Sequence, residues 1–275
     1  MNIVLVHGIL GFSHLDIPLI PLDYFAGVAD SLRARFSASV IAPAINPTGG
    51  IETRSDELRE RIQGALSVGQ LKPGKPIHII AHSMGGLDAR RMISKSPTIT
   101  SNERKSSIQT LATISTPHRG SPIADLIALK FLERIPFLPS VSGESQAALS
   151  KLLEHFRISL EGLHDLTSGS AEHFNSANPN EPSVKYLSFA GGGRSGLVPT
   201  SRFFLPYYEF IKVQSGGREE SDGVVTVSSA RWGDFDPNLW PGDHADEIGH
   251  NLDLPLGNPD AKTLRRYEDI LLHLR

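Results

Sequence analysis

The sequence predicts an α/β fold with a mostly parallel central sheet, and three observations support this. Short β-rich runs alternate along the chain with longer segments of helical period. Several of these runs are apolar at successive positions, which is typical of strands covered by helices on both faces of a parallel sheet. The chain has 275 residues, enough to bury one large core. We therefore expect a single domain over residues 1–275.

Six segments are expected to form strands and four to form helices. The first strand is expected where an apolar run, Ile3–Val6, gives way to polar residues. All expected strands, in chain order, are Ile3–Val6, Val40–Ala42, Ile77–Ile80, Leu111–Ile114, Tyr186–Phe189 and Val224–Val227. The expected helices are approximately Leu22–Phe36, Thr53–Leu66, Gly85–Ser94 and Thr263–Leu274. The repeated order of strand, helix and strand is what an α/β fold requires.

One region, residues 122–174, contains no expected strand. It holds two amphipathic helical stretches, IADLIALKFLERI and ALSKLLEHF, which are joined by the proline-containing segment PFLPSVSGES. An insertion of this kind either adds a structural helical layer or forms a lid over a pocket. The residues alone leave both interpretations open.

The composition excludes several classes of function. The formal net charge is −3 and Lys and Arg are scattered, so we expect no nucleic-acid partner. The chain has no cysteine, which excludes disulfides and thiolate metal sites. No run approaches the roughly 18 consecutive apolar residues of a transmembrane segment. The start, MNIVLVHG, lacks the features of a secretory signal, so we expect a cytoplasmic protein or one exported by a signal-independent route.

The segment IIAHSMGG places Ser83 in a tight turn between an expected strand and an expected helix. Ala81 lies two residues before the serine and Gly85 two residues after it, and only small side chains fit at these positions in a nucleophile elbow. The following helix directs its positive dipole end and free N–H groups at the serine, which favours negative charge on a substrate oxygen. The pattern therefore indicates a serine nucleophile for acyl transfer.

An oxyanion hole needs a second loop, and the run IVLVHGILGF supplies one. The strand Ile3–Val6 ends at His7 and Gly8, so the backbone can turn and present the N–H of Ile9 to a substrate oxygen. The second donor is expected to be the N–H of Met84. We interpret His7 as a structural turn residue rather than as the catalytic base.

The base must be one of eleven histidines. His78 and His82 are too close to Ser83 in sequence to reach back to its side chain, and His118 follows a strand too early. In this type of fold the chain order is serine, acid, histidine, which leaves the C-terminal third.

Two histidines and three aspartates of the C-terminal third remain as candidates. WPGDHADEIGHNLDLP contains His244 and His250, and REESDGVVTVSSARWG contains Asp222 just before a β-rich run. Asp234 and Asp236 compete as the acid, but their segment WGDFDPN is turn-like and expected to face solvent. In order after the elbow, Asp222 is the favoured acid.

Five ordered motifs together resemble one known family. They are LVHGILGF, AHSMGG, TISTPHRGSPIADL, SDGVV and DHADEIGH. In this order they resemble the bacterial true lipases of the pseudomonad type, which are serine triacylglycerol hydrolases with the α/β-hydrolase fold. The resemblance spans most of the chain. It departs from the family at Ala81, which replaces the usual glycine, and in the missing family disulfide.

The resemblance assigns roles to the candidate residues. It implies that Ser83 is the nucleophile, that Asp222 is the acid and that His244, rather than His250, is the base. These three residues would hydrolyse an ester through an acyl-enzyme intermediate.

The resemblance also implies roles around this triad. Ile9 and Met84 would donate the oxyanion hydrogen bonds, and Arg54 would brace the oxyanion loop, although a surface charge on a helix rich in Arg and Glu is the plainer interpretation. Residues 122–174 would form a helical lid over the acyl chain. The expected substrate is a lipid ester, met at a transient lipid–water interface, and the oligomeric state is left open.

A structural calcium ion is the open question about cofactors. Asp246 matches a calcium ligand of the family, but Val198 stands where the partner aspartate is expected. Calcium prefers six to eight oxygen ligands, usually with more than one carboxylate. Asp246 could instead only hydrogen-bond the loop that carries His244. We therefore expect no required cofactor and assign no metal ligand.

Other functions would use the same residues. A short-chain carboxylesterase or a phospholipase needs the same triad. Outside this class, the chain could be a non-catalytic binding protein with the same fold. A metalloenzyme could also be built on HADEIGH, with His244, Asp246 and His250 as ligands.

Overall fold

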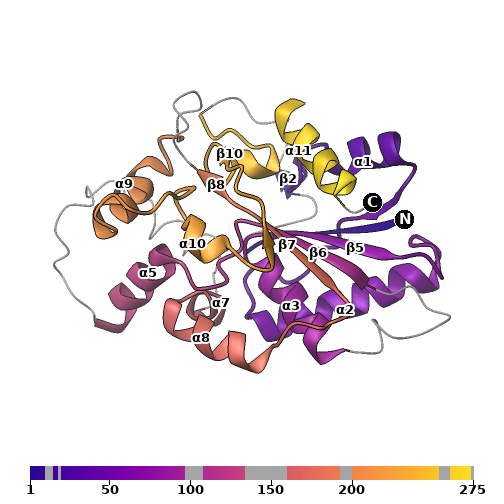
Figure 1. Ribbon diagram of the computed structural model, residues 1–275, viewed down its shortest axis with the longest axis horizontal. Helices are drawn as coiled ribbons and strands as arrows, with labels where there is room; N and C mark the ends of the chain where they lie inside the picture. Colours follow the sequence, from indigo (N-terminus) through magenta and orange to yellow (C-terminus); the bar gives the residue numbers. More distant parts are fainter. Residues whose placement is uncertain are drawn as a thin grey trace.

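The computed structural model describes residues 1–9, 15–17, 20–96, 108–133, 160–192, 200–253 and 261–273 (Figure 1). Its centre is a six-stranded sheet with the order β4-β1-β5-β6-β7-β9. These strands are β4 (Ser39–Ile41), β1 (Asn2–Val6), β5 (Ile77–His82), β6 (Ile108–Ile114), β7 (Lys185–Phe189) and β9 (Asp234–Phe235). Each neighbouring pair is parallel, as the sequence predicts.

The register of the sheet brings the two predicted catalytic loops to one edge. Strand β1 pairs with β5 up to Val6, which lies opposite Ala81. The residues that follow the two strands, His7 after β1 and Ser83 after β5, therefore leave the sheet side by side at its carboxyl edge. This is the edge at which open α/β sheets hold their ligands.

Helices cover both faces of the sheet because its central strands are apolar on both sides. In β1, Val4 and Val6 pack into one core cluster, whereas Ile3 and Leu5 pack into the other. Figure 1 shows α2 (Ile51–Ser67) and α3 (Gly85–Lys95) on one side, and α1 (Val28–Phe36) and α11 (Ala261–Leu272) on the other.

The remaining elements described are further helices and short strands, several of which lie near the carboxyl edge of the sheet. The helices are α5 (Pro122–Glu133), α7 (Leu160–Asp165), α8 (Ser168–Ala177), α9 (Leu205–Gln214), α10 (Val227–Ala230) and the 3₁₀ helix η1 (Asp246–Ile248). The short strands are β2 (Leu15–Ile17), β3 (Ile20–Leu22), β8 (Gly191–Gly192) and β10 (Trp240–Pro241). A third apolar cluster joins α5, α7, α8 and α9 to Met84 and Leu87, next to the predicted nucleophile.

The α/β-hydrolase fold expected from the sequence is confirmed, and five of the six expected strands are present. The expected helices α2, α3 and α11 also match within two residues. Helix α1 begins at Val28 rather than at Leu22, because Leu22 ends strand β3 and Gly27 turns the chain at a positive φ of 66°.

The expected strand Val224–Val227 is wrong. The N–H groups of Val224 and Val225, which a strand would pair with a neighbour, both donate to the Asp222 carboxylate, at 2.8 and 2.7 Å. Thr226 then caps α10 by accepting a hydrogen bond from the N–H of Ser229. Side-chain acceptors have thus replaced the sheet partners that β-branched residues otherwise favour.

The segment WGDFDPN is also more ordered than a turn, since Asp234 and Phe235 form the edge strand β9. In the insertion at residues 122–174, α5 matches the first expected helix. The second expected stretch, at residues 148–156, lies outside the described residues, as do all of residues 134–159. The single domain and the helical lid stay predictions. Among the helices described, none combines the length and apolar character needed to cross a bilayer.

Candidate active site

Ser83 lies on a strained turn between β5 and α3. Its φ is 56°, a left-handed value that non-glycine residues adopt at a cost. The Ser83 N–H donates to the carbonyl of Ile114 at 2.9 Å, and the Ser83 carbonyl accepts from the Thr116 hydroxyl at 2.7 Å. The end of β6 therefore holds both peptide groups of the serine. This is the backbone geometry of a nucleophile elbow.

The glycines around Ser83 allow three segments to meet closely. A Cβ on Gly85 would lie 2.6 Å from the Val6 carbonyl oxygen and 2.7 Å from that of His7. A Cβ on Gly8 would lie 2.7 Å from Ser83 Cβ and 3.1 Å from Ser83 Oγ. The loop after β1 thus passes directly over the nucleophile.

The two predicted oxyanion donors, Ile9 and Met84, lie on this loop and on the elbow. Within the described part of the chain, neither backbone N–H donates to another protein atom. Two N–H groups without protein partners beside Ser83 are what an oxyanion hole requires. Their role in catalysis stays a prediction.

Arg54 is fully buried and braces the loop after β1, the contact that the family resemblance implies. Its Nη2 donates to the His7 carbonyl at 2.7 Å, and its Nε donates to Asp88 Oδ2 at 2.9 Å. Burial raises the pKa of Asp88 to about 6, although the Arg54 charge opposes this shift. The surface-charge interpretation of Arg54 is therefore wrong.

His7 has the structural role expected of it. Its Nδ1 donates to the Gly8 carbonyl at 2.8 Å, and its Nε2 accepts from the N–H of Ile45 at 3.2 Å. Burial, together with the nearby Arg54 charge, lowers the pKa of His7 to about 4. Both ring nitrogens of this neutral imidazole hold backbone groups.

The buried Asp222 and the partly exposed His244 form an acid–base pair. His244 Nδ1 donates to Asp222 Oδ2 at 2.7 Å, which leaves Nε2 available to accept a proton. Asp222 is completely buried, and its second oxygen accepts the N–H groups of Val224 and Val225. The His244 N–H also donates to the Asp222 carbonyl at 3.0 Å. The carboxylate is therefore fixed on both sides.

The His244 ring lies next to the elbow. Its centroid is 4.3 Å from that of His82, the residue before Ser83. The competing base His250 instead places Nε2 against the carbonyls of Asp23 and Tyr24, at 2.8 and 3.0 Å. The competing acids also lie elsewhere: Asp236 binds Asn238, and Asp234 is exposed on the edge strand. The structure thus brings His244 and Asp222 together beside Ser83.

Sequence reasoning missed a second buried carboxyl group, Glu247. Its Oε2 lies 3.0 Å from His82 Nε2 and 3.9 Å from His244 Nδ1, and its Oε1 accepts from the Ser115 hydroxyl at 2.6 Å. Burial and the charge of Asp222 raise the pKa of Glu247 well above its usual value. The motif DHADEIGH contains this residue, but nothing in that pattern shows that its side chain points inward.

The carboxylates next to His244 do not fit a calcium site. Both oxygens of Asp246 accept hydrogen bonds, from the Asp243 N–H and from Asn251. Both oxygens of Asp243 also accept N–H groups, among them that of Ser201. These carboxylates are engaged in shaping the loop that carries His244, and the described residues around them form no oxygen cage. Residue 198 lies outside the described residues, and independence from cofactors stays a prediction.

The metal set considered from the sequence is not assembled among the described residues. There, the cluster of possible ligands that contains His244 includes His82 and Glu247 rather than Asp246 and His250. Its atoms are engaged in the hydrogen bonds of the acid–base pair and of Glu247, so we derive no metal-assisted step.

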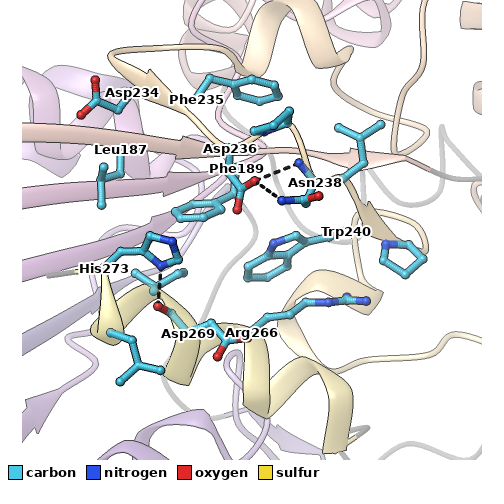
Figure 2. Close-up of a pocket in the computed structure, with 15 residues that line it drawn as sticks. Leu187, Phe189, Asp234, Phe235, Asp236, Asn238, Trp240, Arg266, Asp269 and His273 are labelled. Carbon is cyan, nitrogen blue, oxygen red and sulfur yellow. Dashed lines mark hydrogen bonds between the residues drawn. The ribbon is translucent and has the colours of Figure 1, made fainter.

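A cavity of about 660 Å³ lies away from Ser83, between α11 and the segment from β9 to β10 (Figure 2). Figure 2 shows Phe189 and Trp240 in its wall, Arg266 and Asp269 on α11, and His273 directly after that helix. Neither the serine nor the acid–base pair lines it. Near Ser83, the apolar surroundings are instead the cluster that joins Met84 to α5, α7, α8 and α9.

Comparisons with known proteins agree with this architecture. The chain is 30% identical over 235 residues to triacylglycerol lipase 2 of Saccharomyces cerevisiae, covering 84% of this chain and 63% of that protein. It is 21% identical over 306 residues to a lipase of Staphylococcus epidermidis, covering 83% of this chain and 44% of that protein. The chain therefore spans less than two thirds of the length of either relative.

Solved structures support the fold. The crystal structure of Staphylococcus hyicus lipase matches with a TM-score of 0.64 at 18% identity, covering 99% of this chain and 95% of that one. The metagenomic carboxyl esterase MGS0156 matches with a TM-score of 0.67 at 17% identity, covering 100% and 76%. A family model described as "PGAP1-like alpha/beta domain" matches residues 52–199, more than half of the chain. The protein therefore belongs to the family of PGAP1-like α/β domains.

Proposed function

We propose that this chain is a serine hydrolase that cleaves carboxylic esters of lipids through an acyl-enzyme. The proposal rests chiefly on one arrangement, in which the elbow of Ser83 lies beside the hydrogen-bonded pair of Asp222 and His244. The relatives named as lipases add support, since they match over most of the chain.

The mechanism follows from the hydrogen bonds of the site. His244 Nε2 takes the Ser83 proton as Oγ attacks the ester carbonyl, and Asp222 holds the opposite ring nitrogen and stabilises the imidazolium. The N–H groups of Ile9 and Met84 receive the oxyanion, aided by the positive end of α3. His244 then protonates the leaving alcohol and later activates the water that releases the acid.

The proposed substrate is a triacylglycerol, taken up at a lipid–water interface. Several relatives that match this chain are named triacylglycerol lipases, among them those from Saccharomyces cerevisiae and Burkholderia plantarii, the latter at 27% identity over 46% of this chain. The apolar cluster beside Met84 would accommodate an acyl chain, and residues 122–174 would act as its lid. Kinship with the pseudomonad-type lipases is part of this proposal and rests on the five motifs.

Hydrolysis of two substrates tests the proposal. We expect the purified protein to cleave both emulsified long-chain triacylglycerol and a soluble butyrate ester. Ser83→Ala should lose nearly all of both activities while its circular dichroism is unchanged, because the triad acts as one unit. Turnover of butyrate alone would make the protein a short-chain esterase. Turnover of neither would favour a non-catalytic binding protein.

A matched pair of histidine variants tests the base. We expect His244→Ala to be inactive and His250→Ala to keep its activity, because the His250 ring holds two backbone carbonyls instead of the acid. The reverse result would overturn the assignment of the base.

A further inference from the structure

A chain of buried and partly buried hydrogen bonds joins the two loops of the site, and the mechanism above does not use it. The Gly8 N–H donates to the Tyr24 hydroxyl at 3.0 Å. That hydroxyl lies 2.7 Å from His82 Nδ1, and His82 Nε2 lies 3.0 Å from Glu247 Oε2. The chain starts one residue before the oxyanion donor Ile9 and ends three residues after the base His244.

Close contacts on several sides hold Glu247, the last residue of this chain of hydrogen bonds. Glu247 Oε1 accepts the Ser115 hydroxyl at 2.6 Å, and the same hydroxyl oxygen accepts the Gly191 N–H at 3.0 Å. A Cβ on Gly191 would clash with the Glu247 carboxyl group. Tyr267 also donates to the Glu247 carbonyl at 3.1 Å. Side chain and backbone of Glu247 are therefore both fixed.

The middle of the chain is His82, a completely buried imidazole. Burial and the neighbouring His244 lower the pKa of His82, so it stays neutral. A neutral imidazole donates from one ring nitrogen and accepts at the other, so it can link a hydroxyl to a carboxyl group without an added charge. The ring also contacts that of His244 in a tilted arrangement, with an interplanar angle of 41°.

We propose that Tyr24, His82 and Glu247 are positioning residues that hold the oxyanion loop in register with the loop of the catalytic base. The inference rests on the proposed hydrolase function. Oxyanion donors and base must be placed to within about half an ångström to act on one substrate carbonyl. These three side chains, called the relay below, link the two loops through hydrogen bonds in addition to the strand pairing of the sheet.

The first test is Tyr24→Phe, which removes only the hydroxyl of the relay. We expect kcat for the soluble butyrate ester to fall about 10- to 100-fold, somewhat less than the loss of an entire oxyanion donor, with KM changed less than about twofold. Tyr186→Phe is the matched control, since it also removes a hydroxyl that accepts a backbone N–H but lies on β7. An unchanged kcat in Tyr24→Phe would overturn the proposal.

The second test separates hydrogen bonding from charge. Glu247→Gln can keep both side-chain hydrogen bonds, so kcat should stay within about threefold of the wild type, whereas Glu247→Ala should lose as much as Tyr24→Phe. Because the relay acts as one unit, the double variant Tyr24→Phe/Glu247→Ala should be no slower than its slower parent. Multiplicative losses, or a Gln variant as slow as the Ala variant, would overturn the proposal.

Two controls make the outcome unambiguous. Unfolding curves check that each variant folds. If Glu247→Ala does not fold, Ser115→Ala, which removes the hydroxyl bound to Glu247, replaces it. Ser115→Ala should also lower kcat, and an unchanged kcat would count against the relay. Ser83→Ala separates the two proposals. A Ser83 variant that still hydrolyses the ester refutes the proposed function, whereas an inactive Ser83 variant beside a fully active Tyr24→Phe refutes the relay alone.

Discussion

Two networks of different kinds hold the loop after β1 at one peptide group, the one that joins His7 to Gly8. On one side, the charged Arg54 donates to the His7 carbonyl and pairs with Asp88 on α3. On the other side, the Tyr24 hydroxyl accepts the Gly8 N–H and continues the relay to His82 and Glu247. The first network is an ion pair between two helices, and the second is a chain of hydrogen bonds between loops.

The two networks are expected to affect different properties: the ion pair affects the stability of the fold, and the relay affects the geometry of the active site. A buried ion pair contributes little net stability, but the removal of one partner leaves an uncompensated charge and is strongly destabilising. Substitutions in the relay can keep the hydrogen bonds and avoid that penalty. We therefore expect changes at Arg54 and Asp88 to act mainly on unfolding, and changes in the relay mainly on kcat.

The largest effect is expected for Arg54→Leu. The substitution leaves Asp88 buried without its cation and the His7 carbonyl without its donor, so the free energy of unfolding should fall by about 3–5 kcal/mol. Urea unfolding at pH 7 measures this loss. Arg54→Leu/Asp88→Leu is the control, and it should recover part of the stability because no charge remains buried. A loss of unfolding free energy below about 1 kcal/mol would mean that Arg54 does not stabilise the fold as expected.

The next effect is a pH dependence that belongs to Asp88. Its pKa is raised to about 6 from an ordinary value of 3.8, so the folded state binds the proton more tightly than the unfolded state does. Its contribution to stability is therefore full below pH 3.8 and is lost as the pH rises through 6. The shift corresponds to about 3 kcal/mol across this window.

Asp88→Asn isolates this contribution. The difference in unfolding free energy between wild type and variant should decline with rising pH from about 4 to about 6, as measured by urea unfolding at several pH values. The difference is needed because His7 works in the opposite direction: its lowered pKa gives stability that is lost as the pH falls from 6.5 through 4. A difference that does not vary with pH would contradict the assignment.

A smaller effect on stability is expected in the relay. Glu247→Gln resembles the neutral form of an acid whose pKa is raised well above its usual value, so the amide should fit the same two partners. We expect the free energy of unfolding to change by less than about 1 kcal/mol, the value of a typical hydrogen bond. Thermal unfolding checks this, and a loss as large as that of Arg54→Leu would remove the contrast between the two networks.

Much of the fold was predictable because its signals are local. Successive apolar residues in Ile3–Val6 and Ile77–Ile80 indicate strands covered on both faces, and the small residues around Ser83 indicate the elbow. The strand expected at Val224–Val227 does not form, because the carboxylate of Asp222, the favoured acid, accepts the N–H groups of Val224 and Val225. β-strand propensity takes no account of a side-chain acceptor that competes for the backbone N–H groups.

The site was predictable in part for a similar reason. His244 and Asp222 follow from chain order after the elbow, and the structure places them 2.7 Å apart. Tyr24, Ser115 and Glu247 carry no such signal, because their contacts span up to 165 residues and depend on which way each loop turns. Burial of single polar side chains is a tertiary property, and the sequence does not display it.

The smallest effect is expected for an exposed arginine of helix α2. The sequence of this helix, IETRSDELRERIQGALS, does not show which of its arginines is buried. Arg54 is fully buried, whereas Arg59 pairs with Asp56 at 3.5 Å with 38% and 48% of the two side chains exposed. We expect Arg59→Ala to change the free energy of unfolding by no more than about 0.5 kcal/mol, because solvent screens exposed pairs. Urea unfolding beside Arg54→Leu measures both under one condition. Equal losses of unfolding free energy in Arg54→Leu and Arg59→Ala would show that position on the helix, rather than burial, sets the cost of losing an arginine. The contrast between the Arg54 network and the relay would then fail.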